Sequence, residues 1–494
     1  MRFAPYARRL RTLKFGAEEW AADKAVSLGD SVFHDIARSR TTLEVFPNLR
    51  RLWWETAYWE TAYRDVKSQH AVLFMHDKVK EFAFSLDTET EDLMPLATDV
   101  VGRMPSLLSL KCMCWSPYYE PQCDPILKHL FSNLPKLQEI TIAKQALGGH
   151  VLKVLSLLPE LRVLQFDNMG GIPCIPAPVI ADKLEDGAFP LLDDLCLDST
   201  LEDMRHYLTG GALLPRLRCL SVESTNLESS FAVQEFLNDV TRCYPFLGTI
   251  AIDVIVRIEE QEGCEPLMME HVYPILSLAQ LTHLELRHNL PLQISDVDLA
   301  EFGAALPAIQ FLVLNPEPLL LSKPPFTIHS LPSIGQSFPN LSHLEIYLDA
   351  EDVGTQPTPP PLAKMRVFPY LRTLNVGVSP IGPDQVPVAL YLSYLLSDNE
   401  RVEIRSGNSW DPQLFEHSDQ YKMVSQERCR RWGEVAKTLP LLLQLRKEEK
   451  AHRKDIEKEV EDLRMRNEIL MGNMHLNPEV KHAPLAYDKG CIVS

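Results

Sequence analysis

A short phrase recurs eleven times along this chain of 494 residues, and it constrains the fold more than any other feature. It reads apolar-Pro-x-Leu-x-x-Leu-x-apolar, as in LPELRVLQF from Leu158 and FPNLSHLEI from Phe338. Its proline position falls at residues 47, 105, 135, 159, 190, 215, 245, 307, 339 and 369, and Ala279 occupies it in one copy. Because the copies share one pattern, each is expected to fold into the same small unit.

The spacing of the copies sets the size of this unit. Successive proline positions lie 24 to 34 residues apart, except for one interval of 58 residues between 47 and 105. That interval contains a weaker copy at Val79–Phe84, and another weak copy opens the chain at Leu10, Leu13 and Phe15. The chain therefore contains about thirteen units of roughly thirty residues, a period at the long edge of leucine-rich repeats.

Each unit combines a strand pattern with a helix pattern. Apolar residues stand two, five and seven positions after the proline, and the last two mark a short strand because alternate side chains share a face. Between the strands lie stretches with helical spacing, such as Val233–Val240. One unit cannot bury its apolar face alone, so neighbouring units must stack. We therefore expect Leu164, Leu195, Leu220 and Ile250 to lie side by side in adjacent parallel strands.

The repeats predict an α/β fold, a leucine-rich-repeat solenoid or horseshoe with a parallel inner sheet and outer helices, over residues 1–424. A helical segment over 425–475 and a tail over 476–494 are expected to follow. The alternative is a doubly wound α/β enzyme, but that fold gives no reason for one register of proline and leucine to persist through eleven units.

Composition and motifs narrow the function. The formal net charge of −18 disfavours binding to nucleic acid. We find neither a secretory signal nor an apolar run long enough to span a membrane, so a cytoplasmic or nuclear protein with reduced cysteines is expected.

No nucleotide-binding, hydrolase or metalloprotease motif stands in a suitable context, so we expect no enzyme, cofactor or metal. The nearest cysteine cluster, Cys112, Cys114 and Cys123, lacks the histidines of a zinc site.

Solenoids bind along their concave strand surface, so the candidate partner-binding residues are taken from there. Eight positions after the proline, four successive units carry Asp167, Asp198, Glu223 and Asp253. If stacking is regular, these acids form a ladder that could receive a basic peptide. The alternative is that they are simply the polar residues that end strands.

Aromatic and histidine residues supply further concave candidates. Trp53 should face the concave surface while Trp54 enters the core, either as an interface anchor or as a cover for the end of the array. His283 and His343 occupy the same position two units apart, as ligands or, more simply, as surface residues of the sheet.

The C-terminal helical segment carries a heptad seam. Its members are spaced 4, 3, 4, 3 and 4 residues apart, with an asparagine at an a position: Ile456, Val460, Leu463, Asn467, Leu470 and Met474. Two outcomes are open, a homodimer through 456–474 or a free or docked amphipathic helix. Farther along, Cys491-Ile-Val-Ser494 matches the C-a-a-X pattern for farnesylation, which would give weak membrane association; the alternative is an unmodified tail.

Several of these segments resemble the F-box/leucine-rich-repeat proteins of mushroom-forming (basidiomycete) fungi. The phrase FPNLRRL from Phe46, the opening Phe3–Leu13 and the closing segments Trp432–Lys437 and Leu441–Arg446 carry the likeness, over roughly residues 1–450. The resemblance implies substrate capture for a cullin-type ubiquitin ligase. Because Met1 falls where the repeats begin, F-box helices and binding of a Skp-type adaptor are not expected here.

The leading hypothesis is therefore a non-enzymatic protein-recognition module that binds a protein partner on its concave face. The alternative is a membrane-tethered scaffold, prenylated at Cys491 and dimerised by its C-terminal helix.

Overall fold

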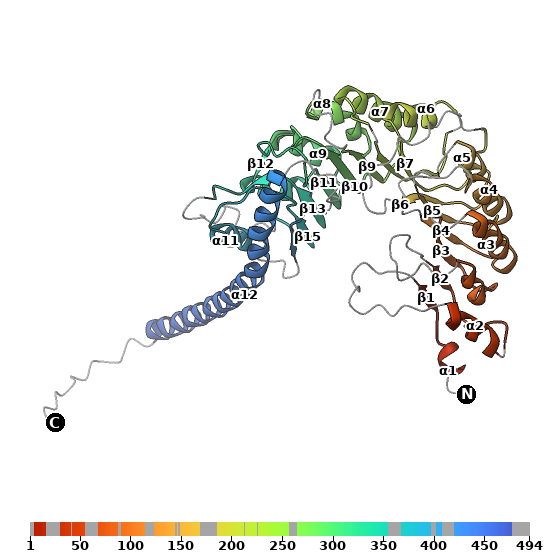
Figure 1. The fold of residues 1–494 in the computed structure, drawn as a ribbon. Coiled ribbons are helices and arrows are strands. Elements are labelled where there is room, and N and C mark those ends of the chain that lie inside the picture. The colour runs from red at the N-terminus through yellow and green to blue at the C-terminus, as the bar shows by residue number, and fades with distance from the viewer. Residues whose placement is uncertain are drawn as a thin grey trace.

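A computed structural model describes residues 4–15, 30–40, 42–54, 68–86, 90–113, 123–143, 146, 149–167, 185–211, 213–224, 226–255, 264–353, 367–396, 402–407 and 419–476. In this part of the chain, one sheet of fourteen strands runs through the molecule in sequence order, and every pair of neighbours is parallel. The sheet lines the inner side of an arch and the helices lie outside it (Figure 1). The predicted leucine-rich-repeat solenoid is therefore confirmed.

The strands and helices alternate along the chain. The sheet consists of β1 (Thr12–Phe15), β2 (Arg51–Trp54), β3 (Glu81–Ser85), β4 (Ser109–Met113), β5 (Glu139–Ala143), β6 (Val163–Asp167), β7 (Asp194–Asp198), β8 (Cys219–Glu223), β9 (Thr249–Val254), β10 (His283–His288), β11 (Phe311–Leu314), β13 (His343–Ile346), β15 (Thr373–Asn375) and β16 (Glu403–Arg405). Two short strands, β12 (Phe326–Thr327) and β14 (Leu348–Asp349), form a separate parallel pair.

The helices of the arch are mostly short. They are α1 (Ala4–Ala7), α2 (Asp30–Ser39), α3 (Thr90–Arg103), α4 (Asp124–Asn133), α5 (Gly149–Ser156), α6 (Leu201–Thr209), α7 (Ser230–Cys243), α8 (Met269–Val272), α9 (Asp296–Ala305), α10 (Leu331–Ser337) and α11 (Val386–Leu395), with 3-10 turns at Ser68–Phe74, Tyr273–Ser277 and Ile328–Ser330. A long final helix, α12 (Asp419–Leu476), follows the last strand. None of the described helices is apolar enough over a sufficient length to cross a bilayer.

The recurring proline explains where the outer helices end. In four units the residue before the proline is the helix C-cap, with φ between −126° and −119° and ψ between 60° and 74°, because proline disfavours a helical conformation in its predecessor. The amide of the apolar residue two positions after the proline then donates to the carbonyl of that C-cap residue, as Leu247 does to Tyr244 at 3.3 Å. This turn directs the chain from the outer helix into the next inner strand.

The apolar spine follows the predicted register. Leu164 pairs with Leu195, Leu195 with Leu220, and Leu220 with Ile250 across adjacent parallel strands, so the predicted alignment is confirmed. All four side chains are fully buried, and they belong to one core that runs the length of the array. Each strand thus closes the apolar face of its neighbours, which no single unit could do.

The first half of α12 belongs to this core as well. Trp432, Val435, Leu439 and Leu443 are buried and pack with the residues of the last repeats. The indole Nε1 of Trp432 donates to the carbonyl of Ser379 at 2.9 Å. This half of the helix therefore covers the C-terminal end of the array, where the last unit would otherwise expose its apolar side. The second half extends away from the arch (Figure 1).

Candidate partner-binding surface on the concave face

The concave surface is built from the strand residues that alternate with the spine. These residues stand four and six positions after the proline, and their side chains point to the inside of the arch because those at five and seven enter the core. Since the strands pair in register, equivalent positions of successive units form continuous rows across the sheet. Side chains that lie far apart in sequence therefore become neighbours on this face.

One row carries a stack of three aromatic rings. His283, Phe311 and His343 are aligned on β10, β11 and β13. The ring centroids of His283 and Phe311 are 5.2 Å apart with planes 7° from parallel, and those of Phe311 and His343 are 5.4 Å apart at 28°. Phe311 is 39% exposed, which is unusual for a phenylalanine on a well-packed sheet and marks it as an accessible apolar group. The fold thus places the two histidines on either side of Phe311.

The next row joins these rings to a charged network. Nε2 of His343 lies 2.9 Å from Oε1 of Glu345, and Nε2 of His283 lies 3.7 Å from Oε2 of Glu285. Arg287 links the two carboxylates: its Nε contacts Glu285, and its Nη2 lies 3.5 Å from Oε2 of Glu345. We call the six residues His283, Glu285, Arg287, Phe311, His343 and Glu345 the concave cluster.

The network holds its charges in a fixed state. Burial would raise the pKa of Glu285, but the nearby His283 ring and the adjacent Arg287 guanidinium lower it to about 2. Burial likewise opposes the charged form of Arg287, and the neighbouring Glu285 outweighs it and raises the Arg287 pKa. The carboxylate and the guanidinium are therefore both ionised at neutral pH, and each restricts the rotamers of the other.

Three of the predicted acids form a row that ends at this cluster. Asp198, Glu223 and Asp253 are register partners on β7, β8 and β9, and the partner of Asp253 on β10 is Arg287. Asp198 is buried, whereas Glu223 and Asp253 are partly exposed. Asp167 ends β6, and the described β6–β7 pairs are Val163 with Asp194 and Leu164 with Leu195; its side chain lies outside the described residues. Arg287 stands at the same repeat position in the unit that follows Asp253, so extending the predicted row by one repeat along the sequence finds it.

Asp253 carries an electrostatic cost that can be measured. Burial, and then the nearby Glu223, raise its pKa to about 7. Because an aspartate in an unfolded chain has a pKa near 4, the folded protein holds a proton that the unfolded chain has released, and stability falls as the pH rises from about 4 to about 7. At pH 8 we expect Asp253→Asn to raise the free energy of unfolding by roughly 1–3 kcal/mol, a figure reduced for the screening of a partly exposed group.

Urea denaturation of both proteins at pH 4 and pH 8 tests this expectation. The advantage of the asparagine variant should shrink to less than about 0.5 kcal/mol at pH 4, where Asp253 is protonated in the folded protein and about half protonated in the unfolded chain. Equal stability of the two proteins at pH 8 would show that Asp253 is ionised in the fold without cost.

Trp53 lies on the same concave face but near the other end of the sheet. It is partly buried on β2, and Nζ of Lys14 on β1 lies 4.0 Å from the centroid of its ring. Trp54 is 1% exposed and stacks on Phe15 within the core. Trp53 is on β2 and the concave cluster is on β10, β11 and β13, so the two lie far apart along the sheet and do not form one site.

Two further features lie at the N-terminal end. A largely apolar cavity of about 1090 Å³ is lined by residues including Phe15, Phe33 and Trp54. The sequence continues from Phe15 and Trp54 directly into residues 16–29 and 55–67, which lie outside the described residues, so we assign no ligand to this cavity.

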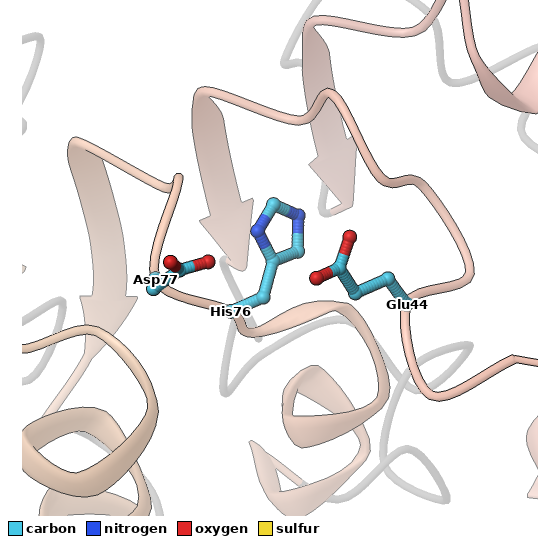
Figure 2. Close-up of side chains that lie close together, drawn as sticks. All are labelled: Glu44, His76 and Asp77. Atoms are coloured by element: carbon cyan, nitrogen blue, oxygen red, sulfur yellow. The ribbon is translucent and has the colours of Figure 1, made fainter.

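Near this cavity, Glu44, His76 and Asp77 lie close enough together to suggest metal ligands (Figure 2). However, both ring nitrogens of His76 are engaged, since Nε2 lies 3.0 Å from the carbonyl of Phe46 and Nδ1 accepts the amide of Lys78 at 3.3 Å. Glu44 pairs with the ammonium group of Lys78 at 3.2 Å. A neutral imidazole has one donor and one acceptor, and His76 uses both in these contacts rather than for a metal. The contacts link the turn at Phe46 to the turn at Lys78.

Two of the predictions concern cysteine residues. Cys112 and Cys123 are buried thiols, while Cys114 lies outside the described residues. Cys491 lies beyond the described part of the chain, and its farnesylation stays a prediction.

Comparison with protein-family models and with the curated proteins finds no match. Several solved structures are similar in fold. Rad7 of yeast, in its complex with Elc1, shares 14% identity over 64% of this chain and 80% of its own, with a TM-score of 0.35. The leucine-rich repeat-containing protein LegL7 of Legionella pneumophila shares 13% over 76% and 98%, with a TM-score of 0.36. A protein of Bacteroides fragilis shares 16% over 47% and 75%, with a TM-score of 0.29.

These likenesses are too distant to carry an argument about function. The classification rests on the chain itself, whose parallel sheet, outer helices and repeat register make it a leucine-rich-repeat solenoid.

Proposed function

We propose that this protein is a non-enzymatic recognition module that binds a protein partner at the concave cluster. The observation that carries the proposal is the exposed Phe311 at the middle of the cluster, flanked by His283 and His343. Protein interfaces combine an aromatic anchor with a rim of polar groups, and concave solenoid faces offer both to an elongated partner.

The polar groups around Phe311 suit recognition because they are fixed before a partner arrives. Each histidine contacts a glutamate, and Arg287 joins the two glutamates. Such a network holds its side chains in place, so that little conformational entropy is lost on binding.

Charge complementarity indicates the chemistry of the partner. The cluster contains two glutamates and one arginine, and the row that ends at Arg287 adds Glu223 and the partly ionised Asp253. The whole chain has a formal net charge of −18. We therefore propose a partner segment with basic residues and one apolar side chain that covers Phe311.

The resemblance to F-box/leucine-rich-repeat proteins suggests a setting for this capture. The role we propose is that of the substrate-binding part of a ubiquitin-ligase receptor, acting in the cytoplasm or nucleus.

Quantitative affinity capture from the protein's own cells tests the proposal. Phe311→Ala should reduce the recovery of the partner at least about tenfold, the effect of losing a central aromatic anchor. Phe231→Ala is the matched control, since Phe231 is 62% exposed on the outer helix α7 and should leave recovery unchanged. Circular dichroism establishes that both variants are folded. If every captured protein is retained equally by the two variants, the concave cluster is not the binding surface.

A further inference from the structure

The second half of α12 is a helix without a covering surface. Its junction with the docked half lies near Arg446, whose guanidinium carbon is 3.8 Å from the centroid of the Tyr394 ring. Every side chain described from residue 447 to residue 471 is exposed. A helix in water without tertiary packing is stabilised by the intrinsic propensity of its residues and by local pairs, such as Arg466 with Asp462 at 2.9 Å. A face that another molecule covers would add to that stability.

The heptad seam is that face. Ile456, Val460, Leu463 and Leu470 are 47%, 40%, 54% and 63% exposed, and their spacing places them along one side of the helix. With Asn467 at an a position, Val460 also falls at a, and the other three fall at d. Large apolar side chains at consecutive a and d positions are the surface that a coiled coil buries.

We propose that this seam pairs with the same seam of a second copy, as a parallel two-stranded coiled coil. A β-branched residue at a, here Val460, together with leucine at d, here Leu463 and Leu470, favours two strands over three or four. In a parallel register the two Asn467 side chains meet at the same level and can hydrogen-bond to each other. Any other register places each amide against an apolar side chain, where it would lose its hydrogen bonds.

The flanking charges favour the same orientation. Glu459 occupies a g position and Arg464 the following e position. In a parallel dimer, g of one helix faces e of the other, so Glu459 meets Arg464 of the second copy on both sides of the seam. In the antiparallel dimer that aligns the whole seam with itself, e faces e and g faces g, so Arg464 would meet Arg464 and Arg466 would meet Arg466. The charge pattern therefore opposes the antiparallel arrangement.

Parallel pairing places both solenoids at one end of the coiled coil. Because the second half of α12 extends away from the arch, the seam is clear of the sheet and of the outer helices (Figure 1). A dimer would then present two concave clusters together. If those clusters bind as proposed above, a partner with two suitable segments would be held more tightly than by one copy, through effective concentration. The pairing itself does not depend on that function.

Sedimentation velocity of the full chain at a series of micromolar concentrations tests the pairing. The monomer mass is 56.1 kDa, and we expect twice this mass to become prominent as the concentration rises, since a seam of little more than two heptads gives a reversible dimer. Leu463→Asp should leave only monomer. The matched control is Ile469→Asp, because Ile469 is 64% exposed on the same helix but lies at a c position, off the seam.

Charge variants test the orientation. Glu459→Arg alone and Arg464→Glu alone should each weaken the dimer, because each places like charges opposite one another in the parallel register. A mixture of these two variants should associate at least as well as wild type, since both 459–464 pairs in the mixed dimer are again opposite in sign.

Three results would overturn the proposal: a chain that is monomeric at every concentration, equal loss of association in Leu463→Asp and Ile469→Asp, or single charge variants that associate like wild type. Circular dichroism on each variant separates loss of pairing from loss of the helix. None of these substitutions touches the concave cluster, so failure here leaves the proposed function standing.

Discussion

Leu220→Ala is expected to lower the free energy of unfolding by about 2–5 kcal/mol, the range found when a large aliphatic side chain is removed from a packed core. Leu220 is fully buried on β8 and pairs in register with Leu195 on one side and Ile250 on the other. Its removal opens a cavity that both neighbouring units share. Because the array is stabilised by contacts between neighbours, the loss should spread to adjacent repeats rather than stay in one strand.

The control for this prediction is the next residue along the same strand. Ser221 points to the concave side, so Ser221→Ala should change the stability by no more than about 0.5 kcal/mol. Chemical denaturation followed by circular dichroism compares the two variants with wild type. Equal effects at the two positions would contradict the alternation of buried and exposed side chains on which the solenoid depends.

Trp432→Ala is expected to cost about 3–5 kcal/mol, the usual result of truncating a buried tryptophan. Trp432 is 1% exposed, and its indole nitrogen satisfies the carbonyl of Ser379. Without this side chain, the first half of α12 loses its main anchor on the array. The end of the solenoid would then be exposed to water, so the last repeats should open more often than the central ones.

Hydrogen exchange measured by mass spectrometry reads this effect by region. Protection should fall in α11 and β15 and be retained in β7, β8 and β9, which lie far from the change along the sheet. Leu441→Ala is the control, because Leu441 lies on the same helix and is 64% exposed. A uniform loss of protection over the whole array would show that α12 does not act as a local cover.

Much of the concave cluster could be found from the sequence, but not its connections. His283 and His343 share one repeat position, and that position of the intervening unit is Phe311, which a row-by-row reading would have placed between them. The role of Arg287 could not be read in this way. Its contact with Glu345 crosses from β10 over β11 to β13, so it depends on the side-chain direction and on the curvature of the sheet.

The helix packing was likewise hidden from the sequence. A Cβ atom at Gly303 of α9 would lie 2.4 Å from the carbonyl oxygen of Ser337, and one at Gly335 of α10 would lie 2.4 Å from that of Val367. These glycines let consecutive outer helices approach the following turn closely. Nothing in the repeat pattern distinguishes them from other helix residues, because the close approach arises between units rather than within one.

The sequence by itself determined the unit, its register and the parallel order of the strands, because one apolar pattern with a fixed proline can be satisfied only by stacking. The tertiary structure decided where α12 divides into a docked and an extended half, and which concave residues meet. Those outcomes depend on distances between units, which a periodic pattern leaves open and only the packed chain fixes.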